Sequence, residues 1–475
     1  MKLTPFHKVL TRTAFLFVAA GCVHFRPSPL SAARSLDDFE ARTLDRPDLV
    51  NYLKTNSLAA SWPLTRWDLP SLTLAAFFYH PDLDVARAQF DVAKGENRRA
   101  GERANPSLTL APGYNSSRPA GAVSYWIADV ALTLPVETAG KRGYRIDQAH
   151  QLSEAARLMI AQTAWQIRRE VRASLLELYS ALENEAQARR LQALQAEAVS
   201  LLQAQADAGE IPRMEVSRAR MQEQASELAV LSARQRQAAA QVRLAGAVGV
   251  PVKAFDKAEF AFDAVRRLPP IPPATELQRA ALLNRTDLLS ALAEYEASQA
   301  ALHLEIAKQV PDVELGPAYQ YDQGENKWAL GFTATLPVFN RNQGAIAAAE
   351  ARRAESAAKF KALQARAIGE VEQAGTAYRS ALEKTDAAQR LSSGLEQKAK
   401  TVLALRAAGE VSRLDVVTER IERTIVEQTC LEARLEALQA LGNIEDVLQM
   451  PSDLSSWTER IPSVNTASSE DKNHE

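Results

Sequence analysis

Residues 126–136 read WIADVALTLPV, and residues 328–338 read WALGFTATLPV, 202 positions further along the chain. The two stretches share the opening tryptophan and the closing Leu-Pro-Val, and both alternate between large apolar residues and small or polar ones. Alternation with a period of two residues predicts a β-strand. The same strand therefore occurs twice in this chain.

The repetition extends well beyond this strand. Two further pairs of segments match at spacings of 205 and 200 residues: Asn105-Pro106-Ser107-Leu108 with Val310-Pro311-Asp312-Val313, and Ala208-Gly209-Glu210 with Ala408-Gly409-Glu410. Self-similarity at a nearly fixed spacing indicates duplication, with small insertions in the loops. We predict two copies of one unit, at residues 71–267 and 274–450, joined by a proline-rich connector at residues 268–273.

Each copy is expected to contain a helix, two strands, a very long helix and a shorter helix. Helical periodicity runs from residue 140 to about residue 208 without a proline, and a second periodic stretch covers about residues 211–247. Helices of this length predict coiled-coil packing rather than a compact domain. They are too polar for lipid, and no apolar run reaches the roughly 18 residues of a transmembrane helix.

The repeated strand has one purely apolar face and one small, polar face. The apolar positions are Trp126, Ala128, Val130, Leu132 and Leu134 in the first copy, and Trp328, Leu330, Phe332, Ala334 and Leu336 in the second. This pattern predicts a membrane strand beside a wet lumen, and Trp126 and Trp328 suit the membrane interface. For one strand alone, a soluble sandwich with one buried face is the alternative. Four strands cannot close a barrel, which needs about 8, so several chains must combine.

The two ends of the chain differ from the repeats. Residues 1–22 combine basic residues, a short apolar run and Gly21-Cys22, which predicts an export signal. The Ala-Gly-Cys ending resembles a lipoprotein cleavage site, with Cys22 as the lipidated residue; ordinary secretory cleavage nearby is the alternative. Residues 23–70 carry scattered prolines and predict an extended segment, and residues 451–475 predict a polar, disordered tail.

The composition argues against several functions. A formal net charge of −2 gives no electrostatic case for nucleic-acid binding. The six histidines are scattered and form no Cys/His cluster, so we expect no metal site and no cofactor. The sequence contains no nucleophile elbow, phosphate-binding loop or HExxH motif, so we do not expect an enzyme.

The repeated motifs resemble the TolC-type family of outer-membrane efflux factors over about residues 70–450. The shared features are the duplication, the Asn-Pro or Val-Pro entry into each strand pair, the Leu-Pro-Val exit, and a glycine with an acid six residues later in each helical hairpin. Two segments are most similar to the heavy-metal cation (CzcC-like) branch: residues 134–142, LPVETAGKR, and residues 336–344, LPVFNRNQG. These segments are turns into the long helices, where Gly140 and Gly344 are expected to relax the backbone and Asn340 or Asn342 to cap a helix.

The resemblance implies a mainly α-helical fold with membrane β-structure. Each chain of a homotrimer would supply four strands to a 12-stranded β-barrel and long helical hairpins to a periplasmic α-barrel. The implied partners are outer-membrane lipid, a periplasmic adaptor protein and an inner-membrane pump of the RND type. The implied location is the bacterial outer membrane, with a long periplasmic portion.

The hairpin turns are the candidate gate. Gly409 is expected to end its helix in the left-handed conformation, which places Asp415 in the first turn or two of the returning helix. Gly209 is expected at the other hairpin turn, followed by Glu215. In a trimer, Asp415 would form an acidic ring at the periplasmic mouth, with Glu215 as a weaker candidate. Alternatively, both acids only cap or solvate the helix starts. Related channels carry a second acid where this chain has Thr418, so we include Thr418 among the gate positions.

These observations predict a passive export duct for heavy-metal cations, driven by an inner-membrane pump. A duct for drugs or other small organic molecules, or for type I protein secretion, is the alternative within the same class. A lipid-anchored coiled-coil scaffold without a pore is the alternative outside it.

Overall fold

The structure, a computed structural model, describes residues 25–56, 64, 66–117, 120–263 and 265–451. The chain divides into two units, residues 1–43 and residues 44–475. The described part of the first unit contains one helix, α2 (Ala32–Glu40). The predicted export signal with Cys22, and residues 452–475 of the predicted tail, lie outside the described residues. None of the described helices is both long and apolar enough to cross a membrane.

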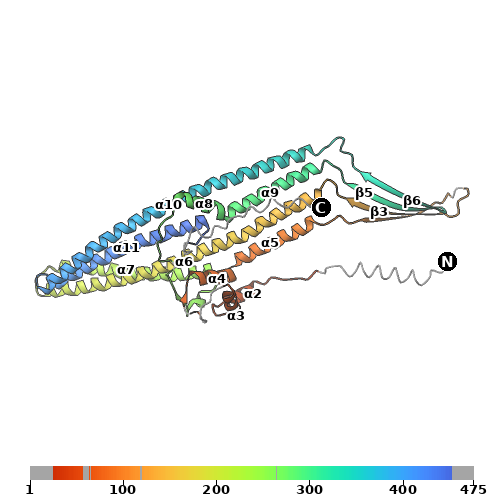
Figure 1. Ribbon diagram of the computed structural model, residues 1–475. Coiled ribbons are helices and arrows are strands. Elements are labelled where there is room, and N and C mark those ends of the chain that lie inside the picture. Colours follow the sequence, from red (N-terminus) through yellow and green to blue (C-terminus); the bar gives the residue numbers. More distant parts are fainter. Residues whose placement is uncertain (1–24, 57–63, 65, 118–119, 264, 452–475) are drawn as a thin grey trace. The chain divides into compact units, whose positions relative to one another are not determined.

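The second unit contains the duplicated elements in the predicted order (Figure 1). The first copy consists of α4 (Leu69–Tyr79), α5 (Pro81–Ala100), β2 (Ser107–Tyr114), β3 (Trp126–Val136), α6 (Lys141–Asp207) and α7 (Arg213–Val248). The second consists of α8 (Ala274–Asn284), α9 (Thr286–Ala307), β5 (Val313–Asp322), β6 (Glu325–Ala334), α10 (Gln343–Ala407) and α11 (Arg413–Leu448). The two strands, the very long helix and the shorter helix predicted for each copy are confirmed, but the single helix predicted ahead of the strands is two helices in each copy, α4 with α5 and α8 with α9.

The extended conformation predicted for residues 23–70 is wrong. Besides α2, this stretch contains α3 (Pro47–Thr55) and a short strand, β1 (Arg66–Trp67). Pro47 is the first residue of α3, where a missing N–H costs no hydrogen bond. β1 pairs in parallel with β4 (Glu259–Phe260), which follows α7 and the 3₁₀ helix Val252–Phe255. This pairing joins segments far apart in sequence, and local patterns carry no signal for it.

The break between α4 and α5 follows from Pro81. His80, the residue before the proline, is extended with φ −75° and ψ 123°, as steric conflict with the proline ring requires. Nδ1 of His80 then accepts a hydrogen bond from the N–H of Asp82 at 3.3 Å and caps α5. Pro81 therefore begins a new helix instead of interrupting one.

Each copy has its own buried apolar core. In the first copy Leu72, Leu175 and Leu244 come from α4, α6 and α7 and are fully buried. In the second copy, Leu277 of α8, Tyr378 of α10 and Leu441 of α11 occupy a separate cluster. Burying a side chain of this size stabilises the fold by about 1.5–3 kcal/mol. α6 joins the two copies, because it packs against α5 and α7 of its own copy and against α9 and α11 of the other.

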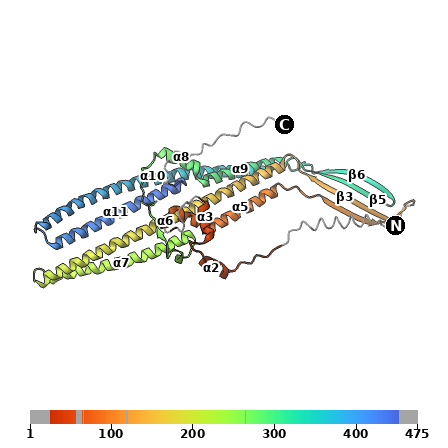
Figure 2. The same ribbon diagram turned by 60° about the horizontal axis from the view of Figure 1, so that its bottom comes forward.

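The four long strands form one antiparallel sheet in the order β2-β3-β5-β6. Both views show this sheet at one end of the second unit, with the hairpin turns α6–α7 and α10–α11 at the other end (Figures 1 and 2). Among the described residues, β2 and β6 each pair with one neighbour, so they are the edges of the sheet. An unpaired edge presents free N–H and C=O groups to a further strand.

The strand predicted to reach Val338 ends earlier. β6 stops at Ala334, which pairs with Val313, the first residue of β5. The equivalent strand β3 reaches Val136, because there it pairs with Val313 from its other side. Residues 335–338 therefore continue the strand pattern in sequence, but no strand of the described part of the chain pairs with them.

Candidate functional site

The sheet has one continuous apolar face. The cross-strand register places the apolar residues of all four strands on it: Leu108, Leu110, Pro112 and Tyr114 of β2; Trp126, Ala128, Val130, Leu132 and Leu134 of β3; Val313, Leu315, Pro317, Tyr319 and Tyr321 of β5; and Trp328, Leu330, Phe332 and Ala334 of β6. Many of these side chains are exposed, with Leu330 and Phe332 each 77% accessible. An exposed apolar surface of this kind indicates contact with lipid or with another protein.

The opposite face is small and polar. One row across the sheet is Ala111, Asp129, Gln320 and Lys327, and the next row towards the helices is Thr109, Ala131, Ala318 and Ala329. Lys327 pairs with Asp322 at 2.6 Å and with Glu325 at 3.5 Å. The contrast between the two faces fits a strand array with lipid on one side and water on the other.

Both predicted interface tryptophans lie on the apolar face. Trp126 packs edge-on against Tyr114 with ring centroids 5.2 Å apart, and Trp328 lies 4.7 Å from Tyr319. They do not share one level of the sheet. Trp328 pairs with Tyr319, which pairs with Val130, four residues along β3 from Trp126.

The two hairpin turns have the same geometry. Gly409 has a φ value of 78°, so the left-handed conformation predicted for it is confirmed, and Gly209 has the same conformation with φ 76°. The N–H of Gly409 donates to the carbonyl of Arg406, and the N–H of Glu410 donates to that of Leu405. Gly209 and Glu210 make the equivalent bonds at the end of α6. These two backbone hydrogen bonds satisfy carbonyl groups that the end of the helix leaves free.

The acids that follow the two turns are held differently. Asp415 is the third residue of α11 and forms a capping box: its N–H donates to Oγ of Ser412 at 3.1 Å, and its Oδ2 accepts from the Ser412 N–H at 2.8 Å. The hydroxyl and N–H of Ser412 hold the pKa of Asp415 below its ordinary value. Glu215 occupies the same position in α7, but Pro212 precedes it without a side-chain cap, and Glu215 pairs with Arg218 at 3.2 Å.

Asp415 and Thr418 are both exposed at the start of α11. Between the turns, Arg413 reaches from α11 to Glu197 of α6, with Nη2 2.8 Å from Oε1. The two hairpins of one chain are therefore linked near their tips. Local sequence patterns give no signal for this contact, because Glu197 lies 216 residues before Arg413.

The contact between α6 and α11 is polar along much of its length. Arg190 pairs with Glu427 at 3.1 Å, and Nε2 of Gln428 donates to Oδ1 of Asn184. Five buried side-chain atoms have no hydrogen-bond partner among the described residues: Nε1 of Trp165, Oε1 of Gln187, Gln195 and Glu419, and Nε of Arg423, although the Arg423 nitrogen forms an ion pair with Glu427 at 3.5 Å. Buried polar atoms without partners weaken a packed contact.

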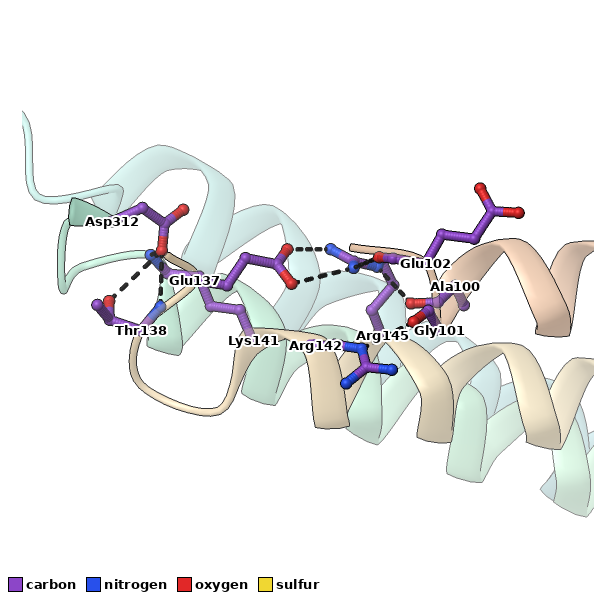
Figure 3. Close-up of polar contacts among 9 residues, drawn as sticks. All are labelled: Ala100, Gly101, Glu102, Glu137, Thr138, Lys141, Arg142, Arg145 and Asp312. Carbon is purple, nitrogen blue, oxygen red and sulfur yellow. Dashed lines mark hydrogen bonds and ion pairs between the residues drawn. The ribbon is translucent and has the colours of Figure 1, made fainter. Parts of the chain in front are cut away.

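The junction between sheet and helices forms a dense polar cluster (Figure 3). Nζ of Lys141, at the start of α6, lies 2.7 Å from Oδ1 of Asp312, just before β5, and donates to the carbonyl of Val310 at 2.5 Å. The N–H of Thr138 donates to the same Asp312 oxygen, and its hydroxyl donates to the carbonyl of Pro311 at 2.7 Å. These contacts tie the exit of the first copy's strands to the entry of the second copy's strands.

The same junction holds the end of α5. Arg142 donates to the carbonyl of Gly101 at 2.8 Å, and Arg145 donates to those of Ala100 and Glu102 (Figure 3). Arg145 also pairs with Glu137 at 2.6 Å. Cations at a helix C-terminus satisfy its free carbonyls and favour its dipole. Residues 134–142, interpreted from sequence as a simple turn, therefore make hydrogen bonds or ion pairs at almost every residue.

The matching turn of the second copy differs from the prediction. Asn342, not Gly344, adopts the left-handed conformation, with φ 64°, and so corresponds to Gly140 with φ 70°. Asn342 precedes α10 without capping it, because its Nδ2 donates instead to the carbonyl and Oε2 of Glu305, both at 2.8 Å. Asn340 accepts only from the N–H of Asn342. The predicted side-chain cap by Asn340 or Asn342 is therefore wrong.

Among the described residues, no group of three or more His, Cys, Asp or Glu side chains has the arrangement of a metal site. The cluster at the junction pairs its acids with lysine and arginine, and the acids of the tips are spread along helix starts.

Comparison with known families agrees with this arrangement. The family described as outer membrane efflux protein matches residues 72–250 and 277–448, which together make up most of the chain. The chain belongs to this family. Its members are efflux channels, not enzymes, so the function class expected from the sequence is confirmed.

Individual relatives of this efflux protein include channels of known structure. The cobalt-zinc-cadmium resistance protein CzcC of Cupriavidus metallidurans is 27% identical over 288 residues, which cover 60% of this chain and 66% of that protein. The match thus spans just under two thirds of the relative's length. The outer-membrane channel OprN superposes with a TM-score of 0.66 at 19% identity, over 82% of this chain and 90% of OprN. CusC, described with transmembrane channel formation, gives 0.65 at 18% identity, over 82% and 95%.

Proposed function

We propose that three copies of this chain form the outer-membrane duct of a tripartite efflux system. Each copy would contribute its four strands to a 12-stranded β-barrel, with the apolar face towards lipid and the small, polar face towards the lumen. The long helices would form the periplasmic part of the duct. Family membership supports the outer-membrane efflux role, and the proposal adds the trimer, the coupling and the cargo.

The sheet is the observation that carries this proposal. A four-stranded sheet with two open edges and an exposed apolar face is unstable alone in water, because both edges and the face need partners. Closing the edges against further copies satisfies the strand hydrogen bonds, and lipid covers the apolar face. A coiled-coil scaffold without a pore would need neither the open edges nor the two-faced sheet.

The periplasmic end would contain the gate and the docking site for partners. We place Asp415 at the mouth as an acidic ring, with Thr418 beside it and Glu215 in a lesser role. An adaptor protein and an RND-type inner-membrane pump would supply the energy, as the resemblance to the efflux family implies.

The proposal also assigns roles to the two repeats, to the interface tryptophans and to the N-terminal segment. Residues 71–267 and 274–450 would be the two efflux-factor repeats, joined by the connector at residues 268–273. Trp126 and Trp328 would lie near the outer-membrane interface. Cys22 would carry a lipid anchor after removal of the export signal at residues 1–22.

Heavy-metal cations are the cargo that the observations favour. The matched relative in Cupriavidus metallidurans is named for cobalt, zinc and cadmium resistance. On the polar face of the sheet, Asp129, Glu314, Asp322 and Glu325 outnumber Lys327, and so favour cations over anions in the lumen.

Deleting the gene and measuring sensitivity tests both the duct and the cargo. We expect the strain to become sensitive to divalent cobalt, zinc and cadmium and to accumulate them, with recovery when the gene is restored. Sensitivity to drugs or dyes with unchanged metal tolerance would assign the alternative cargo. Loss of a secreted protein with neither phenotype would assign type I secretion.

A further inference from the structure

The end of α11 and the start of α9 meet between two long helices. α6 packs against both of them, and so does α10. Gln449, just after α11, accepts hydrogen bonds at Oε1 from the N–H and the hydroxyl of Thr286, at 2.8 and 2.9 Å. An open cavity of about 480 Å³ lies at this meeting point and is lined by side chains of all four helices. Pockets of about 300–1,000 Å³ accommodate small molecules.

The cavity lies on the polar side of α6. Trp165 and Arg169 line it, whereas Ile167 and Val171 are buried in the apolar core of the first copy. Two residues correspond to a rotation of roughly 200° about a helix axis, so the two pairs of side chains point in nearly opposite directions. The cavity is therefore separate from the apolar core, and polar side chains decide its chemistry.

Three charged side chains of the cavity are paired with one another. Arg285, the residue before α9, contacts Asp287 at 2.8 Å and Glu370 of α10 at 2.5 Å. Arg285 is buried, and both carboxylates accept hydrogen bonds from it. These three groups satisfy one another, so they frame the cavity and leave its binding capacity to other residues.

Three further groups of the same cavity lack such partners. Asp446 of α11 and Arg169 of α6 make no hydrogen bond and no ion pair with any described residue. Nε1 of Trp165 is buried without an acceptor among the described residues. Burial raises the pKa of Asp446 to about 6, although Arg169, Arg172 and Arg168 act in the opposite direction. Buried polar groups and partly buried charges are unfavourable without partners, so these three groups favour a ligand from outside the chain.

We propose that this cavity binds a small zwitterion, an amino acid or a short peptide with both ends free. The ammonium group of the ligand pairs with Asp446. Its carboxylate pairs with the guanidinium group of Arg169 and accepts a hydrogen bond from Nε1 of Trp165. Because Asp446 belongs to α11 and Arg169 to α6, the bound ligand joins the two helices. This inference goes beyond the proposed export of metal cations and requires neither the trimer nor that cargo.

The charges of the cavity favour a zwitterion over a simple ion. A cation at Asp446 leaves Arg169 unpaired and is repelled by it, and an anion at Arg169 meets the same difficulty with Asp446. A ligand with one charge of each sign satisfies both side chains, and charge-assisted hydrogen bonds are the strong ones. A metal ion fits less well, because no group of three or more His, Cys, Asp or Glu side chains in the described part of the chain is arranged to hold one.

Amide side chains complete the lining of the cavity. An amide can both donate and accept hydrogen bonds, which is what the peptide group of a ligand requires. Four amides of the lining make no hydrogen bond to other described residues: Gln162 and Gln166 of α6, Gln373 of α10 and Asn443 of α11. The cavity therefore offers partners for the main chain of a short peptide as well as for its two ends.

Binding of capped and uncapped dipeptides tests the proposal. Alanyl-alanine carries both charges, its N-acetyl form lacks the ammonium group, and its C-terminal amide lacks the carboxylate. Free alanine, in which the two charges are closer together, is the second uncapped probe. At pH 7 a free peptide amine, with a pKa of about 8, is protonated, and Asp446 is mostly ionised.

Isothermal titration calorimetry of the detergent-purified full chain measures the affinities. We expect at least one uncapped probe to bind about tenfold or more tightly than either capped dipeptide. Each capped form loses one charge-assisted interaction, and a loss of that kind corresponds to about this factor.

Two variants locate the site. Asp446→Asn should abolish the preference for alanyl-alanine over its N-acetyl form, and Arg169→Gln should abolish the preference over its C-terminal amide. Glu427→Gln and Arg190→Gln are the matched controls, because they change an acid and an arginine of the same two helices outside the cavity. Both controls should bind the probes as the wild type does, and far-UV circular dichroism checks that each variant is folded.

Every outcome either supports or overturns the proposal. A preference for an uncapped probe that the two cavity variants remove selectively supports it. Equal binding of capped and uncapped forms by the wild type overturns the zwitterion, and a preference that neither variant changes overturns the site. No heat and no rise in melting temperature with any probe up to about 10 mM would show that the cavity holds only water, and this also overturns the proposal. None of these results bears on the proposed duct, which conductance tests separately.

Discussion

Asp415 has both a structural role, as a helix cap, and a proposed role in the gate. Its carboxylate caps α11 through Ser412, so the conformational role considered from sequence is present. A capping role and a gating role are compatible, because the same charge remains exposed at the helix start. The two roles can be separated, since Ser412 contributes to the cap but carries no charge.

We therefore predict different effects for two neighbouring substitutions. Asp415→Ala removes the charge, and should raise the conductance of the reconstituted trimer or weaken its block by polyvalent cations. Ser412→Ala weakens the cap but keeps the charge, and should leave the cation block in place. The measurement is single-channel conductance with and without a trivalent cation on the periplasmic side. Equal block in wild type and Asp415→Ala would remove Asp415 from the gate.

Asp312 gives a prediction for pH. Partial burial opposes its charge, but Lys141 and the N–H of Thr138 outweigh this and hold the pKa of Asp312 below its ordinary value of 3.8. A carboxyl with a lowered folded-state pKa stabilises the protein above its unfolded value and loses that contribution as the pH falls through the folded value.

Asp312→Asn should therefore lower the melting temperature at pH 7, by an amount corresponding to about 1 kcal/mol after solvent screening. The difference from wild type should shrink below pH 3.8 as the wild-type carboxyl becomes protonated. Thermal melting followed by circular dichroism at pH 7 and pH 3 checks this. A difference that persists unchanged at pH 3 would show that the charge of Asp312 is not what matters.

At the scale of elements, the ion pairs between helices α6 and α11 are buried in the middle of the helices and more exposed near the tips. In the middle, Arg168 and Arg172 of α6 both contact Glu445 of α11, at 2.9 and 3.2 Å, and all three are largely buried. Arg172 lies against Gly442, where an added Cβ would come within 2.0 Å of its Nη1. Nearer the tips the two helices are joined by the more exposed ion pair of Arg190 with Glu427.

Two glutamates on α11 offer a matched test of this gradient. Glu445→Gln leaves two buried arginines facing a neutral group, which should lower the free energy of unfolding by about 3–5 kcal/mol. Glu427→Gln breaks the exposed pair with Arg190 and should cost less than about 1 kcal/mol. Chemical denaturation followed by circular dichroism compares the two. Similar losses of unfolding free energy for both variants would contradict the view that the buried ion pairs of Glu445 hold α6 and α11 together.

The elements were predictable where the signal was local and repeated. The long helices followed from periodicity, and the two strand pairs followed from alternation that occurs twice. The early end of β6 was not predictable, because the pattern at residues 335–338 is intact and only the partner strand is missing. The pairing of β1 with β4 depends on residues almost 200 positions apart, which no local pattern encodes.

The site was predictable in outline but not in its contacts. The hairpin glycines and the acids after them followed from helix-end chemistry. The contacts of the junction could not be predicted, because Lys141, Arg142 and Arg145 look like an ordinary basic stretch in the sequence. Only the fold brings Asp312 and the carbonyls of residues 100–102 beside them. The signal that could have found it was the unequal chemistry of the two exits: three basic residues in one copy, none at the equivalent positions of the other.

At the scale of the whole molecule, the duplication leaves the second unit with two unmatched edges, β2 and β6, on one sheet. Three such sheets placed edge to edge would make the proposed barrel, and the helical hairpins would make the proposed periplasmic duct. The proposed efflux function therefore depends on a continuous water-filled path, which a single chain does not form.

Conductance in planar lipid bilayers tests that property most directly. Purified protein added to one side should produce discrete, long-lived current steps that favour cations over anions, and Asp415→Ala should alter their size or their block by polyvalent cations. Protein that binds the bilayer or assembles into trimers, yet never produces current steps, even with Asp415 replaced, would contradict the account of this chain as an efflux duct.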